Sequence, residues 1–209
     1  MKVLIVGVSG VTCGGKTTVI KELKKLFPSS EIFHQDDYFL NVDDPRHVWC
    51  EDLDHINYDI LSSLDNDKMY EDILIAIGKR ELYEIKPKMK NISTCSTPSD
   101  LSEAIAEKLK EQNIQLLLLD GFLLFSYKPL LPFITLKYFS TLSREECVKR
   151  REKRVYIPPD IPGYFEKYVW PEYLKNFKEL RKSNSDINYI NAETQNILQV
   201  ILHDINNLL

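Results

Sequence analysis

The sequence predicts a three-layer α/β fold in which helices flank a parallel sheet, and two observations carry that prediction. An apolar run at residues 3–8 leads directly into residues 10–17, which fit the pattern G-x-x-x-x-G-K-[ST], and an amphipathic helical segment follows at residues 16–26. Strand-like apolar runs and helix-like amphipathic segments then alternate along the chain, as in proteins built from βαβ units. We therefore expect a phosphate-binding loop within a P-loop nucleotide-binding fold.

Each part of this loop has chemistry suited to a triphosphate. Its glycines let the backbone turn its N–H groups inward, and the positive end of the following helix lies at the same point. Lys16 is expected to reach the β and γ phosphates, and Thr17 to offer its hydroxyl to a magnesium ion. The residues expected to bind ATP here are Gly10, Thr12, Gly14, Gly15, Lys16, Thr17 and Thr18.

Composition and charge narrow the class of protein. The 209 residues, 44% hydrophobic and 28% charged, suit one globular domain over residues 1–209, and no apolar run approaches the ~20 residues that cross a bilayer. A net charge of −4 with interspersed signs argues against nucleic acid as a partner. The start of the chain has no signal-peptide pattern, and its four cysteines form no C-x-x-C pair. We expect a cytosolic or nuclear protein with reduced thiols, a monomer or weak homodimer, that acts on a small molecule and not at a membrane.

Two predicted strands end in carboxylates. The short strand at residues 31–34 leads into Asp36 and Asp37, at the strand end where open α/β sheets bind ligands. Asp36 is expected to act as a general base for an acceptor hydroxyl or to stand near the metal, whereas Asp37 fits a capping or solvated loop residue better. A second apolar run, residues 116–119, ends at Asp120, which we expect to hold magnesium or its water shell opposite Lys16.

The other segments predict further helices, strands and a lid. Helices are expected at residues 55–77, 100–112, 145–155, 164–181 with a kink near Trp170-Pro171, and 193–209, and strands at 134–141 and 187–190. Residues 79–99 show little periodicity and are interpreted as a hairpin or a mobile excursion. The basic helix and the proline-rich loop after it are typical of a lid, about residues 144–163, that closes over phosphates. Its Arg150 and Arg154 are expected at ATP, and its Lys149 and Lys153 in solvent.

Several segments together resemble the nicotinamide riboside kinases. They are Gly-Val-Ser-Gly-Val-Thr at residues 7–12, Gln-Asp-Asp-Tyr-Phe at 35–39, Tyr-Asp at 58–59, Asp-Gly-Phe-Leu-Leu-Phe at 120–125, Arg-Val-Tyr-Ile-Pro-Pro-Asp at 154–160 and Pro-Gly-Tyr-Phe at 162–165. They follow the family's order from Lys2 to about Lys175. The family belongs to the uridine kinase-like branch of the P-loop kinases. The resemblance implies a five-stranded parallel sheet with a helical lid, and phosphorylation of the 5′-hydroxyl of nicotinamide riboside, or of nicotinic acid riboside, by ATP with Mg²⁺ for NAD synthesis.

The resemblance also implies a role for each matching residue. These roles are Asp36 as the base and near the metal, Lys16 as the phosphate clamp, Thr17 and Asp120 at magnesium, Tyr58 and Tyr156 on the two faces of the nicotinamide ring, Asp59 and Arg151 at the ribose hydroxyls, and Asp160 at the substrate. Tyrosine faces suit a flat pyridinium cation. In two places the chain departs from the family: Asp120 replaces the usual Glu, which leaves open whether it reaches magnesium directly or through water, and residues 79–115 are longer than in relatives.

Three functions stay open on the sequence. The paired tyrosines favour a nicotinamide riboside kinase. A uridine or cytidine kinase of the same branch would share the phosphate site, but no side chains that would recognise a base edge can be identified. A nucleotide-binding interaction module without turnover is disfavoured because a pure binder needs no base such as Asp36. An Asp36→Ala variant separates these classes, since it is expected to keep ATP binding and lose turnover.

Overall fold

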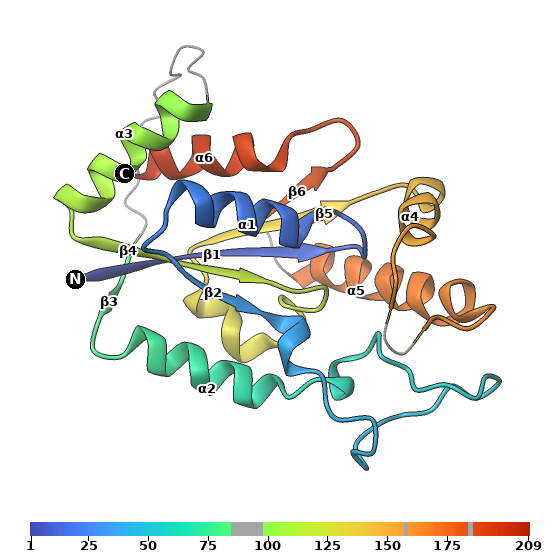
Figure 1. The fold of residues 1–209 in the computed structure, drawn as a ribbon. Coiled ribbons are helices and arrows are strands. Elements are labelled where there is room, and N and C mark those ends of the chain that lie inside the picture. Colours follow the sequence, from blue (N-terminus) through green and yellow to red (C-terminus); the bar gives the residue numbers. More distant parts are fainter. Residues whose placement is uncertain (85–97, 157–158, 184–185) are drawn as a thin grey trace.

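The computed structural model describes residues 1–84, 98–156, 159–183 and 186–209 (Figure 1). Five parallel strands lie in the order β2-β4-β1-β5-β6. Their bounds are β1 Lys2–Gly10, β2 Glu31–His34, β4 Ile114–Asp120, β5 Leu136–Thr141 and β6 Ile187–Asn191. A sixth strand in the described part of the chain, β3 (Glu81–Leu82), pairs with the start of β1. The predicted α/β class and its five strands are confirmed, whereas β3 was not predicted.

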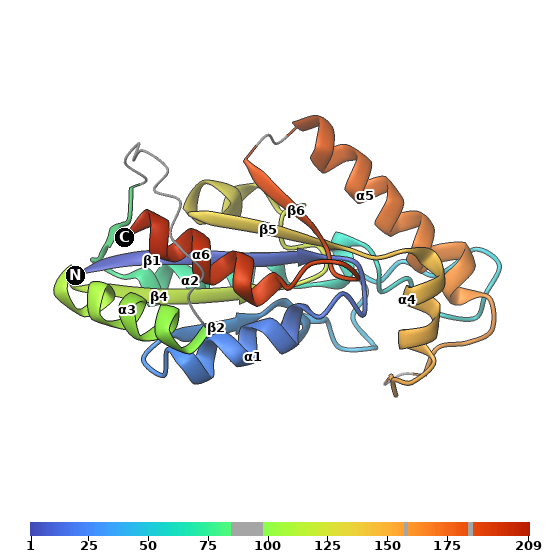
Figure 2. The same cartoon turned by 90° about the horizontal axis from the view of Figure 1, so that it is seen from above.

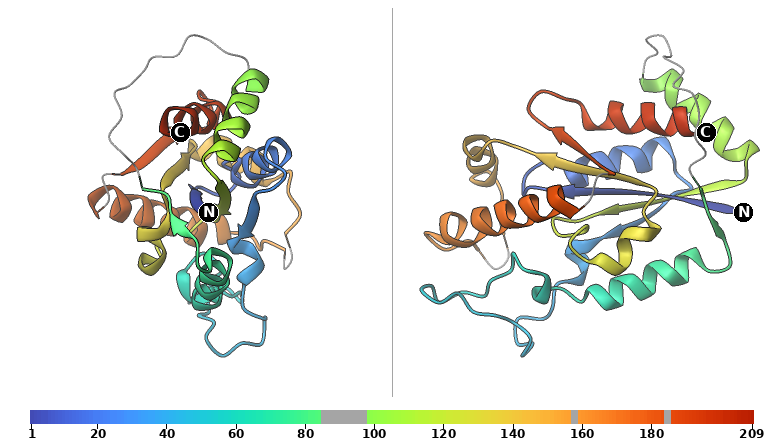
Figure 3. Two further views of the ribbon diagram at one scale, coloured as in Figure 1. Left: turned by 90° about the vertical axis from the view of Figure 1, so that its left-hand side faces the viewer. Right: turned by 180° about the vertical axis from the view of Figure 1, so that it is seen from behind.

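Strand β1 lies at the centre of the sheet because both of its faces are apolar and covered. Side chains alternate between the faces of a strand, so Leu4, Val6 and Val8 pack on one side and Val3 and Ile5 on the other. The first face is covered by helices α1 (Lys16–Leu26), α3 (Pro98–Glu111) and α6 (Ile197–Leu208), and the second by α2 (Asn66–Ile77) and α5 (Trp170–Ser183). Figure 3 shows the helical layers on both sides of the sheet.

The parallel arrangement brings the chemically important segments to one edge of the sheet. Strands β1, β2 and β4 all end at this edge. The phosphate loop follows β1, Asp36 follows β2, and Asp120 is the last residue of β4. Helix α4 (Arg144–Arg151) and the start of α5 lie beyond the same strand ends (Figure 2). Binding sites of open α/β sheets occur at this position.

Helix α2 begins at Asn66, so the predicted start near His55 is wrong. The Asp65 side chain caps the helix by accepting a hydrogen bond from the Lys68 backbone N–H at 3.0 Å. Residues 55–65 form a loop with one 3₁₀ turn, Leu61–Ser63. The apolar residues of this stretch are spaced as in a helix, which explains the wrong prediction. In the structure, His55, Tyr58 and Asp59 of this loop line a cavity.

The lid and carboxyl-terminal helices also differ from their predicted bounds. Helix α4 ends at Arg151, so Lys153 and Arg154 follow the helix instead of belonging to it. A π-helical turn, Phe165–Val169, precedes α5 at the place where a kink was predicted. Helix α6 begins only after Asn196, whose side chain caps it. Strand β5 likewise begins at Leu136, two positions after the predicted start.

Other predictions are tested only for part of the chain. Residues 85–97, with Cys95 and most of the predicted excursion at 79–99, lie outside the described residues, as do Ile157 and Pro158 of the predicted lid. The other three cysteines, Cys13, Cys50 and Cys147, are buried free thiols, as expected. None of the described helices is both long enough and apolar enough to span a membrane.

Candidate active site

A cavity of about 270 Å³ opens at the carboxyl edge of the sheet. It brings together the predicted site residues Thr12, Gly14, Gly15, Lys16, Thr17, Asp36, Tyr58, Asp59, Asp120, Arg151, Arg154, Tyr156 and Asp160. Its other lining residues are Cys13, Phe39, Leu40, Val42, His55, Gly121 and Phe122. Three predicted ATP-binding residues, Gly10, Thr18 and Arg150, lie outside this lining. The sequence therefore identified about two thirds of the cavity wall.

The phosphate loop is held in place by strand β5 and by its own lysine. Gly10 has φ of +120°, and a Cβ at this position would lie 2.1 Å from the Ser140 carbonyl oxygen, so a glycine is required. The Lys16 Nζ donates to the carbonyl oxygens of Gly10 at 3.0 Å and Val11 at 2.7 Å. Burial lowers the pKa of Lys16, although Asp36 and Asp120 oppose that shift. The ammonium thus lies in the phosphate loop with two carbonyl oxygens as its partners.

Asp120 receives a hydrogen bond on each carboxylate oxygen. The Thr17 hydroxyl donates to Oδ2 at 2.7 Å, and His34 Nδ1 contacts Oδ1. Magnesium prefers such hydroxyl and carboxylate oxygens but is usually held by one or two protein groups, with phosphates and water completing its shell. Among the described residues, no cluster of three His, Cys, Asp or Glu side chains suited to a metal occurs. The Thr17 and Asp120 pair therefore fits magnesium bound together with a nucleotide.

Asp36 is positioned by its buried neighbour Gln35. The Gln35 Oε1 accepts from the Leu123 backbone N–H at 2.9 Å, and its Nε2 donates to Asn66 Oδ1 at 3.1 Å. Gly121 makes room for this side chain, because a Cβ there would lie 2.3 Å from Gln35 Oε1. The 3₁₀ turn Gln35–Tyr38 is thereby fixed against β4 and α2. Gln35 belongs to a motif that was quoted from the sequence, but no role was predicted for it.

The surroundings of Asp36 raise its pKa above that of an ordinary aspartate. Burial raises the pKa of Asp36, the Asp120 charge adds to the increase, and Lys16 opposes it. Its side chain borders the cavity and is open to the solvent inside it. Asp37 is exposed and lies outside the cavity lining, in agreement with the loop role favoured for it. Of the two neighbouring carboxylates, only Asp36 can therefore meet a ligand in the cavity.

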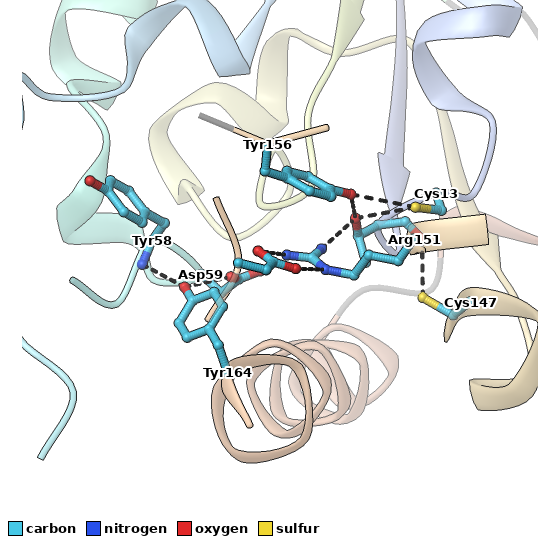
Figure 4. Close-up of polar contacts among 9 residues, drawn as sticks. Cys13, Tyr58, Asp59, Cys147, Arg151, Tyr156 and Tyr164 are labelled. Carbon is cyan, nitrogen blue, oxygen red and sulfur yellow. Dashed lines mark hydrogen bonds and ion pairs between the residues drawn. The ribbon is translucent and has the colours of Figure 1, made fainter. Parts of the chain in front are cut away.

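Tyr164 connects two residues of the predicted riboside site (Figure 4). Its hydroxyl accepts from the Tyr58 backbone N–H at 2.8 Å and donates to Asp59 Oδ2 at 2.9 Å. Burial raises the pKa of Asp59 to about 6, while Arg151 and the Tyr164 hydrogen bond act in the opposite direction. Tyr164 is only 2% exposed and precedes the π-helical turn. Its place in the Pro-Gly-Tyr-Phe segment was noticed in the sequence, but its role was not.

Aromatic rings line the cavity beside Asp59. Phe39 stacks on Phe122 with ring centres 5.8 Å apart and meets Tyr58 edge to face at 5.8 Å. His55 also meets Tyr58 edge to face, with ring centres 5.6 Å apart. These rings offer an aromatic ligand both ring faces and ring edges to pack against.

Arg151, drawn in Figure 4, connects helix α4 to the phosphate loop and to Asp160. It donates to both Asp160 oxygens, at 2.5 and 2.8 Å, and to the Thr12 hydroxyl at 3.0 Å. Its guanidinium carbon lies 4.2 Å from the centre of the Tyr156 ring, within the range of a cation–π contact. The Tyr156 hydroxyl in turn lies 3.5 Å from Thr12 Oγ1. The ring of Tyr156 therefore already accommodates one planar cation.

The two other arginines of the predicted lid occupy different places. Arg154 lines the cavity after the end of α4. Arg150 donates to the Cys13 carbonyl oxygen at 3.3 Å and to Glu146 at 2.7 Å, so it touches the back of the phosphate loop. Their predicted contact with ATP stays a prediction.

Comparison with known proteins identifies the family. No protein-family model matches the chain. Nicotinamide riboside kinase 1 of Rattus norvegicus is 36% identical over 192 residues, which cover 92% of this chain and 87% of the relative. The chain belongs to the nicotinamide riboside kinase family. Nicotinamide riboside kinase 2 of Mus musculus is 33% identical over 99% of this chain and 97% of its own length. Membership in the nicotinamide riboside kinase family confirms the resemblance carried by the sequence motifs.

Solved structures give a weaker similarity. A possible uridine kinase from Bacillus stearothermophilus superposes with a TM-score of 0.49 and 14% identity, over 90% of this chain and 89% of that one.

Proposed function

We propose that this protein transfers the γ-phosphoryl group of ATP to the 5′-hydroxyl of nicotinamide riboside and so forms the mononucleotide used for NAD synthesis. The observation that carries the proposal is a single cavity that joins Lys16 and Thr17 of the phosphate loop to Tyr58 and Asp59, with Asp36 in the same lining. The similar proteins of rat and mouse are named as kinases of this riboside. A phosphate donor and a flat cationic nucleoside would therefore share one site.

In the phosphate half of the cavity, Lys16 would exchange its two backbone carbonyl partners for the β and γ phosphates. Thr17 and Asp120 would hold magnesium beside them. When bound, the ion neutralises charge on the phosphate oxygens during transfer. Arg154 from the lid would add a second positive group at the same phosphates.

In the acceptor half, Asp36 would orient the 5′-hydroxyl and take its proton as the new P–O bond forms. The raised pKa of Asp36 makes it a better proton acceptor, and Lys16 nearby favours its ionised form. Asp59, with Arg151 and Asp160, would hold the ribose hydroxyls. These contacts fix the distance between acceptor oxygen and phosphorus, which lowers the entropic part of the barrier.

The aromatic residues would select the base. Tyr58 and Tyr156 line the cavity, and the Arg151 guanidinium over Tyr156 is a planar cation in the kind of contact that a pyridinium would make. We further propose that residues 144–156 and 159–163 act as a lid over the phosphates. The net charge of −4 supports small molecules, and not nucleic acid, as partners. We also propose that the protein is a monomer or weak homodimer in the cytosol or nucleus.

A competition experiment tests the substrate. The purified protein is incubated with magnesium ATP and equal amounts of nicotinamide riboside, nicotinic acid riboside, uridine and cytidine, and the products are quantified by mass spectrometry. The proposal predicts that a pyridine mononucleotide is the main product, and that an Asp36→Asn control forms almost none. If UMP or CMP is the main product, the protein is a pyrimidine nucleoside kinase with the same phosphate site. If no acceptor is phosphorylated, the result favours a binding module without turnover.

A further inference from the structure

We propose that His34 is a positioning residue that holds the Asp120 carboxylate in the orientation needed at magnesium. The inference rests on the proposed function only in that a magnesium nucleotide binds at the phosphate loop. His34 is the last residue of β2, and Asp120 is the last residue of β4. The two are direct register partners on neighbouring strands, so their side chains leave the sheet on the same face.

The hydrogen bonds to Asp120 fix the plane of its carboxylate. His34 Nδ1 contacts Oδ1, and the Thr17 hydroxyl donates to Oδ2 at 2.7 Å. Because an ionised carboxylate can only accept hydrogen bonds, Nδ1 is the donor in this pair. The terminal torsion of an aspartate is otherwise broad, and a donor on each oxygen removes that freedom. Each oxygen keeps a second lone pair for the ion or for one of its waters.

Water cannot replace the histidine easily at this place. Asp120 is 4% exposed, so a lost donor would leave one oxygen with little access to solvent. The His34 side chain, in contrast, is 27% exposed and therefore only partly enclosed by the protein. Its contact with the carboxylate, and not the filling of a core, is thus its main specific interaction, and replacing it should leave the fold in place.

The test measures metal binding directly. Mn²⁺ replaces Mg²⁺, and free Mn²⁺ is followed by electron paramagnetic resonance in a titration of the enzyme with ADP. His34→Ala is expected to weaken Mn²⁺ binding by about tenfold or more, because hydrogen-bond partners of metal ligands commonly have effects of this size. The Mg²⁺ concentration for half-maximal activity should rise by a similar factor. His34→Asn places an amide nitrogen where Nδ1 was and should recover most of the affinity.

Two results would overturn the inference. Wild-type Mn²⁺ affinity in His34→Ala would show that the contact does not matter for the metal, and equal losses in the Ala and Asn variants would assign the effect to the ring and not to its donated hydrogen bond. His203→Ala on α6, whose side chain is 51% exposed, is the matched control and should bind Mn²⁺ normally. If the Ala variant does not fold, as judged by circular dichroism, the Asn variant decides.

The titration contains no riboside, so this result is independent of the proposed substrate. Failure to phosphorylate nicotinamide riboside would refute the proposed function, while an altered Mn²⁺ affinity in His34→Ala would still support the role of His34.

Discussion

Replacing Tyr164 by Phe removes one hydroxyl from the centre of the riboside half of the site. The ring itself should stay in place, because it packs 4.4 Å from the His55 ring centre and 5.9 Å from that of Tyr168. What is lost is the pair of hydrogen bonds to the Tyr58 backbone N–H at 2.8 Å and the Asp59 carboxylate at 2.9 Å. The substitution therefore probes position and charge without removing a core side chain.

The expected magnitude follows from these two bonds. A hydrogen bond to a charged group contributes about 1.5–3 kcal/mol, and a neutral one about 0.5–1.5 kcal/mol. If the hydrogen bond from Tyr164 is needed to hold the charged Asp59 carboxylate at the ribose, kcat/KM for the riboside should fall by about 10- to 100-fold. This follows from about 1.4 kcal/mol per factor of ten. The pKa of Asp59, already raised to about 6, should rise further because a hydrogen bond that lowers it is gone. The acid limb of kcat/KM should then move to higher pH.

The assay is kcat/KM for nicotinamide riboside from pH 5 to 9, with thermal unfolding as a check on folding. Tyr168→Phe is a matched control, because that hydroxyl also accepts from a backbone N–H, of Glu51 at 2.9 Å, and donates to a carboxylate, of Asp52 at 2.7 Å, outside the cavity lining. The control should keep wild-type kcat/KM. A Tyr164→Phe variant with wild-type kcat/KM and an unshifted pH profile would refute the positioning role of Tyr164.

Three further predictions concern the base, the ribose acid and the phosphate loop. Asp36→Asn should lower kcat by about 10²- to 10⁴-fold with nearly unchanged ATP binding by calorimetry; unchanged turnover would remove Asp36 from the role of base. Because the folded-state pKa of Asp59 is raised from 3.8 to about 6, its contribution to stability is present below the lower value and lost as pH rises through the higher one. Asp59→Asn should therefore gain stability relative to wild type at pH 8 and not at pH 4, and kcat/KM of the wild type should fall below about pH 6; equal unfolding differences at both pH values would contradict this. Gly10→Ala should destabilise the fold by more than the roughly 1–2 kcal/mol of a positive φ alone, because its Cβ would lie 2.1 Å from the Ser140 carbonyl oxygen. Gly78→Ala is the control, since Gly78 also has a positive φ but its Cβ would meet only a contact at 3.4 Å. Equal losses of the free energy of unfolding in urea would argue against the close approach at Gly10.

Local patterns were sufficient for much of the fold. The buried run in β1 and the glycine-rich segment after it are continuous in sequence, so their periodicity and spacing define a strand, a loop and a helix start together. The predicted start of α2 was wrong because it depends on contacts between residues far apart in the sequence. Residues 55–65 have apolar spacing suited to a helix, but Tyr58 and Asp59 are held in a loop by hydrogen bonds with the distant Tyr164. No local sequence pattern predicts such a contact.

The site shows the same division between local and distant information. Lys16, Thr17 and Asp36 lie in or near short motifs, and their place in the cavity could be predicted from the chain alone. His34 was passed over because its partner, Asp120, lies 86 positions away, and only the parallel pairing of β2 and β4 brings them together. Phe39 and Phe122 were quoted within motifs, yet their stacking likewise depends on the fold.

Transfer of an isotope label tests most directly whether one cavity joins phosphate transfer to a nicotinamide riboside site. The protein is incubated with ATP labelled at the γ position with ³²P, magnesium and nicotinamide riboside, and labelled mononucleotide and ADP are measured over time. We expect one labelled nicotinamide mononucleotide for each ADP formed, and almost none with Asp36→Asn although that variant still binds ATP. ADP formation without labelled mononucleotide, or equal labelling with Asp36→Asn, would contradict it.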